Sequence, residues 1–221
     1  MLKNGSTERL TLMDRIDRRM STAHDVDGLW VGAFTNGDEA ALQRVEDALQ
    51  LMRQQSPLHY SRIVRNLDRI WVHLTPAARG HYLRRLNACV LDERFVLAEE
   101  TTLEQIASVI VHEATHAALE RRGIAYDEPQ RHRIEAIYIR RQLHFVSSLT
   151  GCDAEKESVR ASLDYYVDNQ EFFSDANMQQ RYLKGGVETL RWLGVPSWLV
   201  AVFSKVANLR RRLSSWRTAA P

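Results

Sequence analysis

A predicted helix from Thr101 to Arg122 constrains the fold of this chain most, because it carries two histidines four residues apart. Thr101 and Glu104 fit a capping box, a pattern that starts helices. His112 and His116 then project from one face, one turn apart, because a helix has about 3.6 residues per turn. The apolar residues on the same side are Ile106, Val109, Ile110 and Ala117. We therefore expect both histidines to face the interior.

Two imidazoles placed in this way can bind one metal ion. Zinc accepts neutral imidazole nitrogens, and catalytic zinc sites hold the ion with three protein ligands and a water. Glu113 follows His112 directly and lies about 100° further round the helix. That offset puts its carboxylate beside the metal, in the position of a general base. The simpler alternative is a buried histidine pair with no metal.

A third ligand is required, and Glu135 is the first candidate. A third histidine six residues after His116 is missing, since positions 119 and 122 hold leucine and arginine. Glu135 stands 19 residues after His116 (135 − 116 = 19), on a helix that Pro129 opens and that reaches about residue 148. Two histidines and one glutamate form an established catalytic zinc set. The competing candidates are His132, Glu120 and Glu128.

His112, Glu113 and His116 are followed by Glu135 in the run Arg-Ile-Glu-Ala. In these residues the chain resembles the gluzincin class of metallopeptidases. It also resembles uncharacterised bacterial metallopeptidase domains. The resemblance covers about residues 70–145, and it lacks the Asn-Glu-x-x-Ser-Asp form around the third ligand. It implies a zincin-like fold, with one Zn²⁺ per chain held by His112, His116 and Glu135, and a peptide or protein substrate.

The expected reaction is hydrolysis by a zinc-activated water, with Glu113 as the general base. A second donor to the oxyanion is expected. Tyr138 and His132 are candidates because they flank Glu135 at i+3 and i−3, and Tyr126 is a third. Two other functions stay open: a zinc hydrolase of a non-peptide amide or another small substrate, and a non-catalytic, metal-stabilised scaffold or membrane-associated protein.

We expect an α+β fold, mainly helical, with a small sheet beside the metal-binding helix. All 221 residues form one domain: a partly ordered lead-in over 1–37, a zincin-like core over 38–150 and a helical part over 151–221. Strand composition occurs at 70–74 and 88–98 only. Val90–Leu97 is the candidate for a free edge that binds a peptide, and a core strand that binds nothing is an equal alternative. The other predicted helices cover 38–53 and 57–66, and the C-terminal helices break near 169, 185–186 and 194–196.

Composition restricts the partners and the compartment. Two separated cysteines and no signal-like N-terminus favour a cytoplasmic protein, and Cys89 reads as a buried thiol. A net charge of +2 gives no reason to expect nucleic-acid binding. The segment Ser197–Trp216 resembles a basic amphipathic helix that can touch a membrane surface weakly. Packing of its apolar face on the protein's own core is the favoured alternative. The oligomeric state is open.

Overall fold

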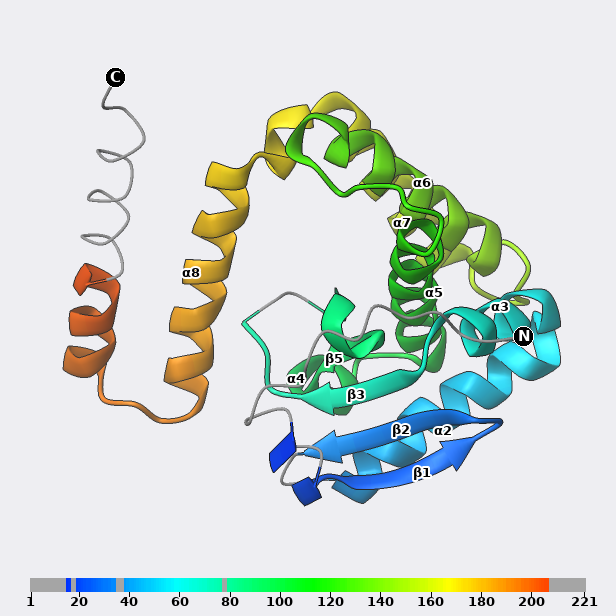
Figure 1. The fold of residues 1–221 in the computed structure, drawn as a ribbon, viewed down its shortest axis with the longest axis horizontal. Helices are drawn as coiled ribbons and strands as arrows, with labels where there is room; N and C mark the ends of the chain where they lie inside the picture. Colours follow the sequence, from blue (N-terminus) through cyan, green and yellow to red (C-terminus); the bar gives the residue numbers. More distant parts are fainter. Residues whose placement is uncertain (1–14, 17–18, 35–37, 77–78, 207–221) are drawn as a thin grey trace.

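The computed structural model describes residues 15–16, 19–34, 38–76 and 79–206, which form a mainly helical α+β fold with one mixed sheet (Figure 1). The strands are β1 (Thr22–Val26), β2 (Leu29–Phe34), β3 (Arg69–His73), β4 (Gly80–Leu83) and β5 (Ala88–Asp92). The helices are α2 (Asp38–Gln55), α3 (Pro57–Asn66), α4 (Glu93–Leu97), α5 (Leu103–Glu120), α6 (Glu128–Val146), α7 (Asp153–Asp168) and α8 (Asp175–Trp192), with short 3-10 turns η1 (Arg84–Leu86) and η2 (Gln170–Phe173).

The sheet has the order β1-β2-β3-β5-β4. Its three inner strands are parallel, while β1 and β4 pair antiparallel at the two edges. Successive side chains in a strand point to opposite faces. On β3, Ile70 and Val72 therefore join the main core, while Trp71 joins a smaller cluster with Leu86 and Ala88 on the other face.

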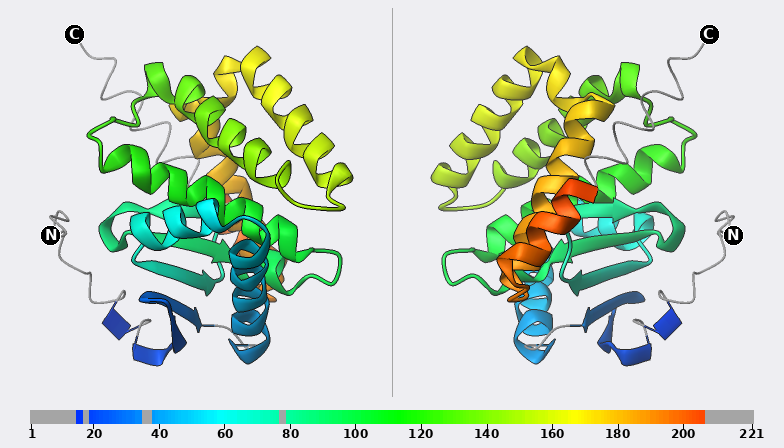
Figure 2. Two further views of the ribbon diagram at one scale, coloured as in Figure 1. Left: turned by 90° about the vertical axis from the view of Figure 1, so that its right-hand side faces the viewer. Right: turned by 90° about the vertical axis from the view of Figure 1, so that its left-hand side faces the viewer.

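Helices α2 and α5 cover the face of the sheet that carries the main core, and α5 continues into contact with α6. Figure 2 shows the sheet and α2 at one end of the molecule, with α6 and α7 at the other end and α5 between them. The apolar residues of α5 face both neighbours, which is why 11 of its 18 side chains are buried. A helix held on two sides in this way gives a rigid base for a functional site.

The expectation of only two strands was wrong. Strands β1 and β2 lie inside the segment expected as a lead-in, and β2 is an inner strand with Leu29, Val31 and Ala33 fully buried. Residues 93–97 form helix α4, so the predicted strand ends at Asp92, whose side chain caps that helix. Strand β5 pairs with both β3 and β4, so it is an inner strand and offers no free edge; the edges of the sheet are β1 and β4.

In the C-terminal half, helices end at the expected positions near residues 169 and 194, but no helix ends at 185–186. Gly194 has a positive φ of 74°, which suits the end of a helix. Helix α8 runs through Gly185 and Gly186 without interruption. A Cβ atom on Gly185 would lie 2.0 Å from the carbonyl oxygen of Pro76, so this glycine permits a close approach rather than a break.

A further helical segment covers residues 197–206. Its apolar face does not pack on the core as expected: Trp198 is 67% exposed and Phe203 56%, while Val200 alone is buried. The rest of the predicted amphipathic helix, from 207 on, lies outside the described residues. Over the described ranges, every helix is too short or too polar to cross a bilayer.

Candidate metal centre

Helix α5 begins one residue later than the sequence predicted. Thr102, not Thr101, is the N-cap: its hydroxyl accepts from the amide of Gln105, whose side chain accepts in turn from the amide of Thr102. The capping box is therefore Thr102 and Gln105 rather than Thr101 and Glu104. The shift does not alter the spacing of His112 and His116, because both lie well inside the helix.

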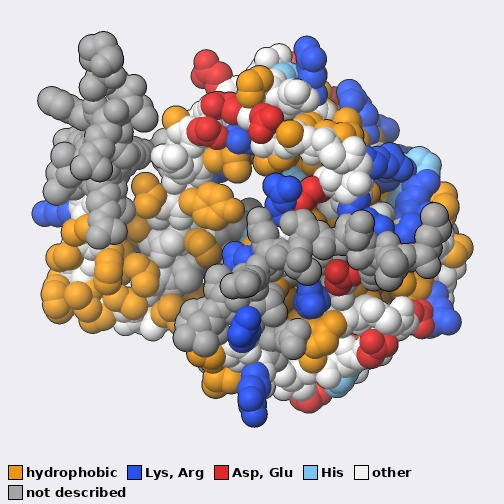
Figure 3. Space-filling view, in the orientation of Figure 1, with side chains coloured by type: hydrophobic (Ala, Val, Ile, Leu, Met, Phe, Trp, Pro, Cys, Tyr) orange, Lys and Arg blue, Asp and Glu red, His pale blue; other side chains and the backbone are white. Residues whose placement is uncertain are grey.

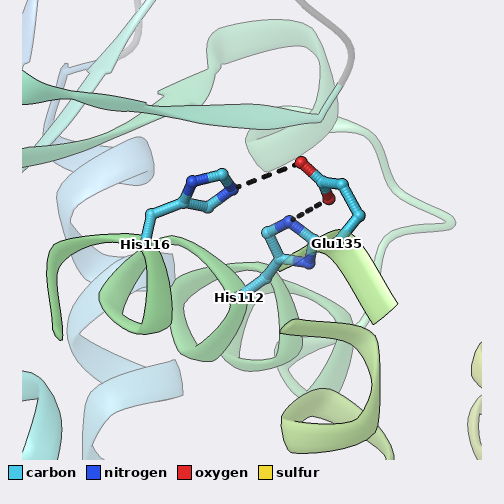
Figure 4. Close-up of side chains that lie close together, drawn as sticks. All are labelled: His112, His116 and Glu135. Atoms are coloured by element: carbon cyan, nitrogen blue, oxygen red, sulfur yellow. Dashed lines mark ion pairs between the residues drawn. The ribbon is translucent and has the colours of Figure 1, made fainter. Parts of the chain in front are cut away.

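The two histidines of α5 meet Glu135 of α6 (Figure 4). Nε2 of His112 lies 3.4 Å from Oε2 of Glu135, and Nε2 of His116 lies 3.8 Å from Oε1 of the same carboxylate. One ligand atom from each of the three residues falls within 4.8 Å of the others. Two turns of one helix and one residue of the next thus converge on a single point.

These distances suit a tetrahedral ion. Ligand atoms at about 2.1 Å from such an ion lie about 3.4 Å from one another. The two nitrogen–oxygen separations, 3.4 and 3.8 Å, are near that length, although they run to the two different oxygens of the Glu135 carboxylate. The donor set of two imidazoles and one carboxylate is one that zinc favours in catalytic sites.

Gln142 fixes the orientation of His112. Nε2 of Gln142 donates to the hydroxyl of Ser108 over 3.0 Å, which leaves its Oε1 as an acceptor. That oxygen lies 3.0 Å from Nδ1 of His112, so Nδ1 carries the proton and Nε2 faces Glu135. Metal-binding histidines are commonly held by such a partner. Gln142 lies seven residues after Glu135, two turns along the same face, a spacing from which the sequence could have suggested it.

Glu113 lies beside the three ligands, only 5% exposed. The backbone amide of Tyr82, on strand β4, donates to its carboxylate. The other oxygen, Oε2, has no hydrogen-bond partner among the described residues and lies 3.9 Å from Nε2 of His116. One oxygen is therefore held in place, and the other is available to a group bound at the centre.

The charges of the site are strongly coupled. Burial raises the pKa of Glu113 to about 7, helped by Glu135 and opposed by His112 and the Tyr82 amide. Burial alone would lower the pKa of His112, but its contact with Glu135 outweighs this effect and raises that pKa to about 9. Burial and the neighbouring His112 lower the pKa of His116 to about 3. Without a cation, a proton on His112 balances the Glu135 carboxylate.

Two tyrosines complete the wall of the centre. The Tyr126 hydroxyl donates to Oε1 of Glu135, so the tyrosine expected as an oxyanion donor contacts the candidate ligand instead. The ring of Tyr138 lies 3.7 Å from the ring of His116, centroid to centroid, and 5.3 Å from that of His112. Burial and the Glu135 charge raise the pKa of both tyrosines, so their hydroxyls are protonated donors.

The other sequence candidates lie elsewhere. His132 is outside the cavity that contains the three converging residues. The neighbouring Arg131 occupies that side of α6: it is buried, lies over the Tyr126 ring and pairs with Asp175 at 2.8 Å. Glu128 accepts a hydrogen bond from the amide of Asp175, and so joins α6 to α8 rather than to the centre. Sequence patterns gave no sign of Arg131, because its polar partners, Asp175 and the Phe173 carbonyl, are more than 40 residues away along the chain.

Glu120 also lines the cavity, but it makes an ion pair with Arg84. It lies one turn beyond His116 on the same helix, and it is not among the three residues whose ligand atoms converge. Of these two glutamates, only Glu135 therefore converges with the histidines, and Glu120 lies in the wall of the cavity.

The centre opens into a cavity of about 890 Å³. Strand β4 contributes Gly80, His81 and Tyr82 to one wall, and α8 contributes Arg181 and Gly185 among others to the wall opposite. The close contact between Gly185 and Pro76 holds α8 against the loop that leads into β4. The three converging residues are thus accessible to a molecule much larger than water.

Comparisons with protein-family models, with curated proteins and with solved structures give no match.

Proposed function

We propose that this chain is a zinc-dependent hydrolase with a zincin-like arrangement, and that it cleaves peptide bonds. One observation carries the proposal: His112, His116 and Glu135 converge on one point directly beside the unpaired oxygen of Glu113. A purely structural zinc site tends to use four protein ligands. The described residues supply three, together with a carboxylate placed as a base.

In this proposal, His112, His116 and Glu135 would hold the ion. Bound zinc supplies Lewis acidity, which lowers the pKa of water and polarises a carbonyl group. Glu113 accepts the proton that water loses as it adds to the carbonyl carbon, and its Oε2 is the oxygen free to do so. The same carboxyl then gives the proton to the leaving nitrogen. Tyr138, whose ring lies against His116, is the candidate hydroxyl donor for the developing oxyanion, because the Tyr126 hydroxyl already donates to Glu135.

The free edge of β4 favours an extended peptide over a compact small molecule. Among the described strands β4 is an outer one, and three of its four residues line the cavity. An exposed strand edge can pair with an extended chain through main-chain hydrogen bonds. A peptide laid along β4 would pass close to Glu113, because the Tyr82 amide donates to that carboxylate; the peptide would pair with β4 at residues other than Tyr82.

The test combines metal content with hydrolysis. We expect about one zinc ion per purified chain by plasma mass spectrometry, lost in His116→Ala because two ligands bind too weakly. Glu113→Gln should keep the zinc and lower the hydrolysis of a quenched-fluorescent peptide library by on the order of 10² to 10⁴-fold. Glu104→Gln makes the same chemical change on the same helix, away from the centre, and should leave both readouts unchanged.

Three results would contradict the proposal in different ways. A wild-type chain that takes up no zinc at neutral pH rules out the metal centre. Full turnover in Glu113→Gln rules out the general base. If the chain takes up zinc and cleaves small amides but no peptides, the metal centre is supported and the proposed substrate class is wrong.

A further inference from the structure

The segment after the cavity wall carries a large apolar surface that no part of the described chain covers. At the end of α8 and on the helical segment 197–206, six large apolar side chains are 45–67% exposed. They are Trp192, Leu193, Trp198, Val202, Phe203 and Val206, and together they are called here the C-terminal apolar surface. Figure 3 shows hydrophobic side chains gathered over this part of the molecule, away from the sheet.

Three of the six side chains form a stripe on the helical segment. Trp198, Val202 and Val206 follow one another at four-residue spacing, so they lie on one face of the helical segment. Val200, on another face, is 3% exposed and marks the side that packs inward. Isolated exposed apolar residues are ordinary, but a contiguous surface of this kind marks an interaction site.

Charge identifies the partner. From residue 189 to the C-terminus the sequence has no acidic residue, and its basic residues are Arg191, Lys205, Arg210, Arg211, Arg212 and Arg217. This excess of positive charge attracts an anionic surface and repels a second copy of the same segment. Two tryptophans in the apolar surface fit the boundary between lipid headgroups and acyl chains, where this side chain is enriched.

We propose that the C-terminal apolar surface binds the face of an anionic lipid bilayer, without crossing it. The apolar stripe enters the headgroup boundary, while Arg191 and Lys205, the basic residues of the described part of this segment, contact lipid phosphates. Helix α8, which ends in Trp192 with Leu193 as its C-cap, also lines the cavity. Adsorption would therefore hold the cavity close to the membrane. The proposal does not depend on hydrolysis.

The test is co-sedimentation of the full chain with vesicles. We expect it to sediment with vesicles of phosphatidylcholine mixed with phosphatidylglycerol, at least tenfold more tightly than with phosphatidylcholine alone, and less in high salt. Trp198→Ser combined with Phe203→Ser should lower that affinity at least tenfold. Leu58→Ser combined with Ile137→Ser makes equivalent changes at exposed positions on α3 and α6, and should bind like the wild type.

A second variant tests the proposal in case the first variant does not fold. Replacing Arg191 and Lys205 by Gln keeps all six residues of the apolar surface and should weaken the preference for phosphatidylglycerol. A wild-type chain that stays in solution with both vesicle types overturns the proposal. So does a wild-type dimer in light scattering that Trp198→Ser with Phe203→Ser dissociates while neither protein binds vesicles, since the surface would then join two copies.

Discussion

At the scale of single residues, Gln142 determines which nitrogen of His112 is presented to a metal. Replacing it with Leu removes the acceptor for the Nδ1 proton, so the ring loses its fixed orientation. Changes to such partners typically cost about 10 to 100-fold in metal affinity. We expect a loss of that size for Gln142→Leu, measured by competition with a zinc chelator. Gln130→Leu, an exposed change at the start of the same helix, should have no effect; equal losses in both would contradict the role.

His59 gives the fold a pH dependence on the acid side. It is 2% exposed, and its Nδ1 lies 2.8 Å from the Ser56 hydroxyl. Burial, and then the nearby His144, Arg62 and Arg141, lower its pKa from 6.5 to about 4. Between those values the unfolded chain binds more protons than the folded chain, so the stability from neutral His59 is complete above pH 6.5 and is lost as the pH falls towards 4.

The measurement is urea unfolding at several pH values between 7 and 4. We expect the unfolding free energy to fall with pH over this window, and more steeply in the wild type than in His59→Gln. His81, whose pKa burial also lowers to about 4, adds to the slope in both proteins. The same slope in both would show that His59 does not carry the effect.

Residue spacing predicted the converging set but not its surroundings. The periodicity of a helix was enough to pair His112 with His116, and a glutamate on the next helix was the natural partner. The Tyr82 amide that holds Glu113 was beyond such reasoning, because it depends on how an edge strand packs against α5. His132 was misplaced because a difference of three residues also turns a side chain by about 60° around the helix axis.

At the scale of elements, helices were easier to predict than strands. Helices α2 and α3 match the apolar periodicity and the Ser-Pro start that predicted them. Strand β4 was missed because Gly-His-Tyr-Leu is short and half-buried throughout, with no alternation of apolar and polar residues. Strand β2 was missed because Gly32 interrupts its apolar residues, and a glycine inside a short apolar run resembles a loop.

The two adjacent glycines of α8 allow a matched test of how that helix is held. Nothing lies within 4 Å of a Cβ at Gly186, so Gly186→Ala should stabilise the protein by about 0.5–1 kcal/mol through helix propensity. Gly185→Ala would meet the Pro76 carbonyl oxygen and should lower the melting temperature relative to Gly186→Ala. Peptide hydrolysis should fall in Gly185→Ala only. Indistinguishable melting curves would mean that α8 does not rest on this contact.

At the scale of the whole molecule, Cys89 reports on the integrity of the sheet. Its thiol is fully buried on the inner strand β5, and burial, with a smaller effect of Glu113, raises its pKa well above the usual value. Only the thiolate reacts with a disulfide reagent, so Cys89 should be silent in the native protein. Burial and the neighbouring Glu104 also raise the pKa of Cys152, but this thiol is partly exposed and should react before Cys89.

We therefore expect one fast thiol per native chain, and a second only on unfolding. Cys152→Ser should remove the fast reaction and leave the slow one, whose rate then follows global opening. A fast reaction in Cys152→Ser would mean that β5 opens locally, and that the sheet is not the rigid support of the centre.

Strand β4 has two roles at the site, one carried by its main chain and the other by a side chain. It holds Glu113 through a main-chain amide, which every amino acid except proline provides, while its Tyr82 side chain forms part of the cavity wall. A substitution at position 82 other than proline therefore keeps the amide that holds Glu113, while it gives up the hydrogen bond of the Tyr82 hydroxyl to Asn87 and reshapes the cavity wall beside His116. Libraries that vary position 82 and omit proline should yield new selectivities with the same base.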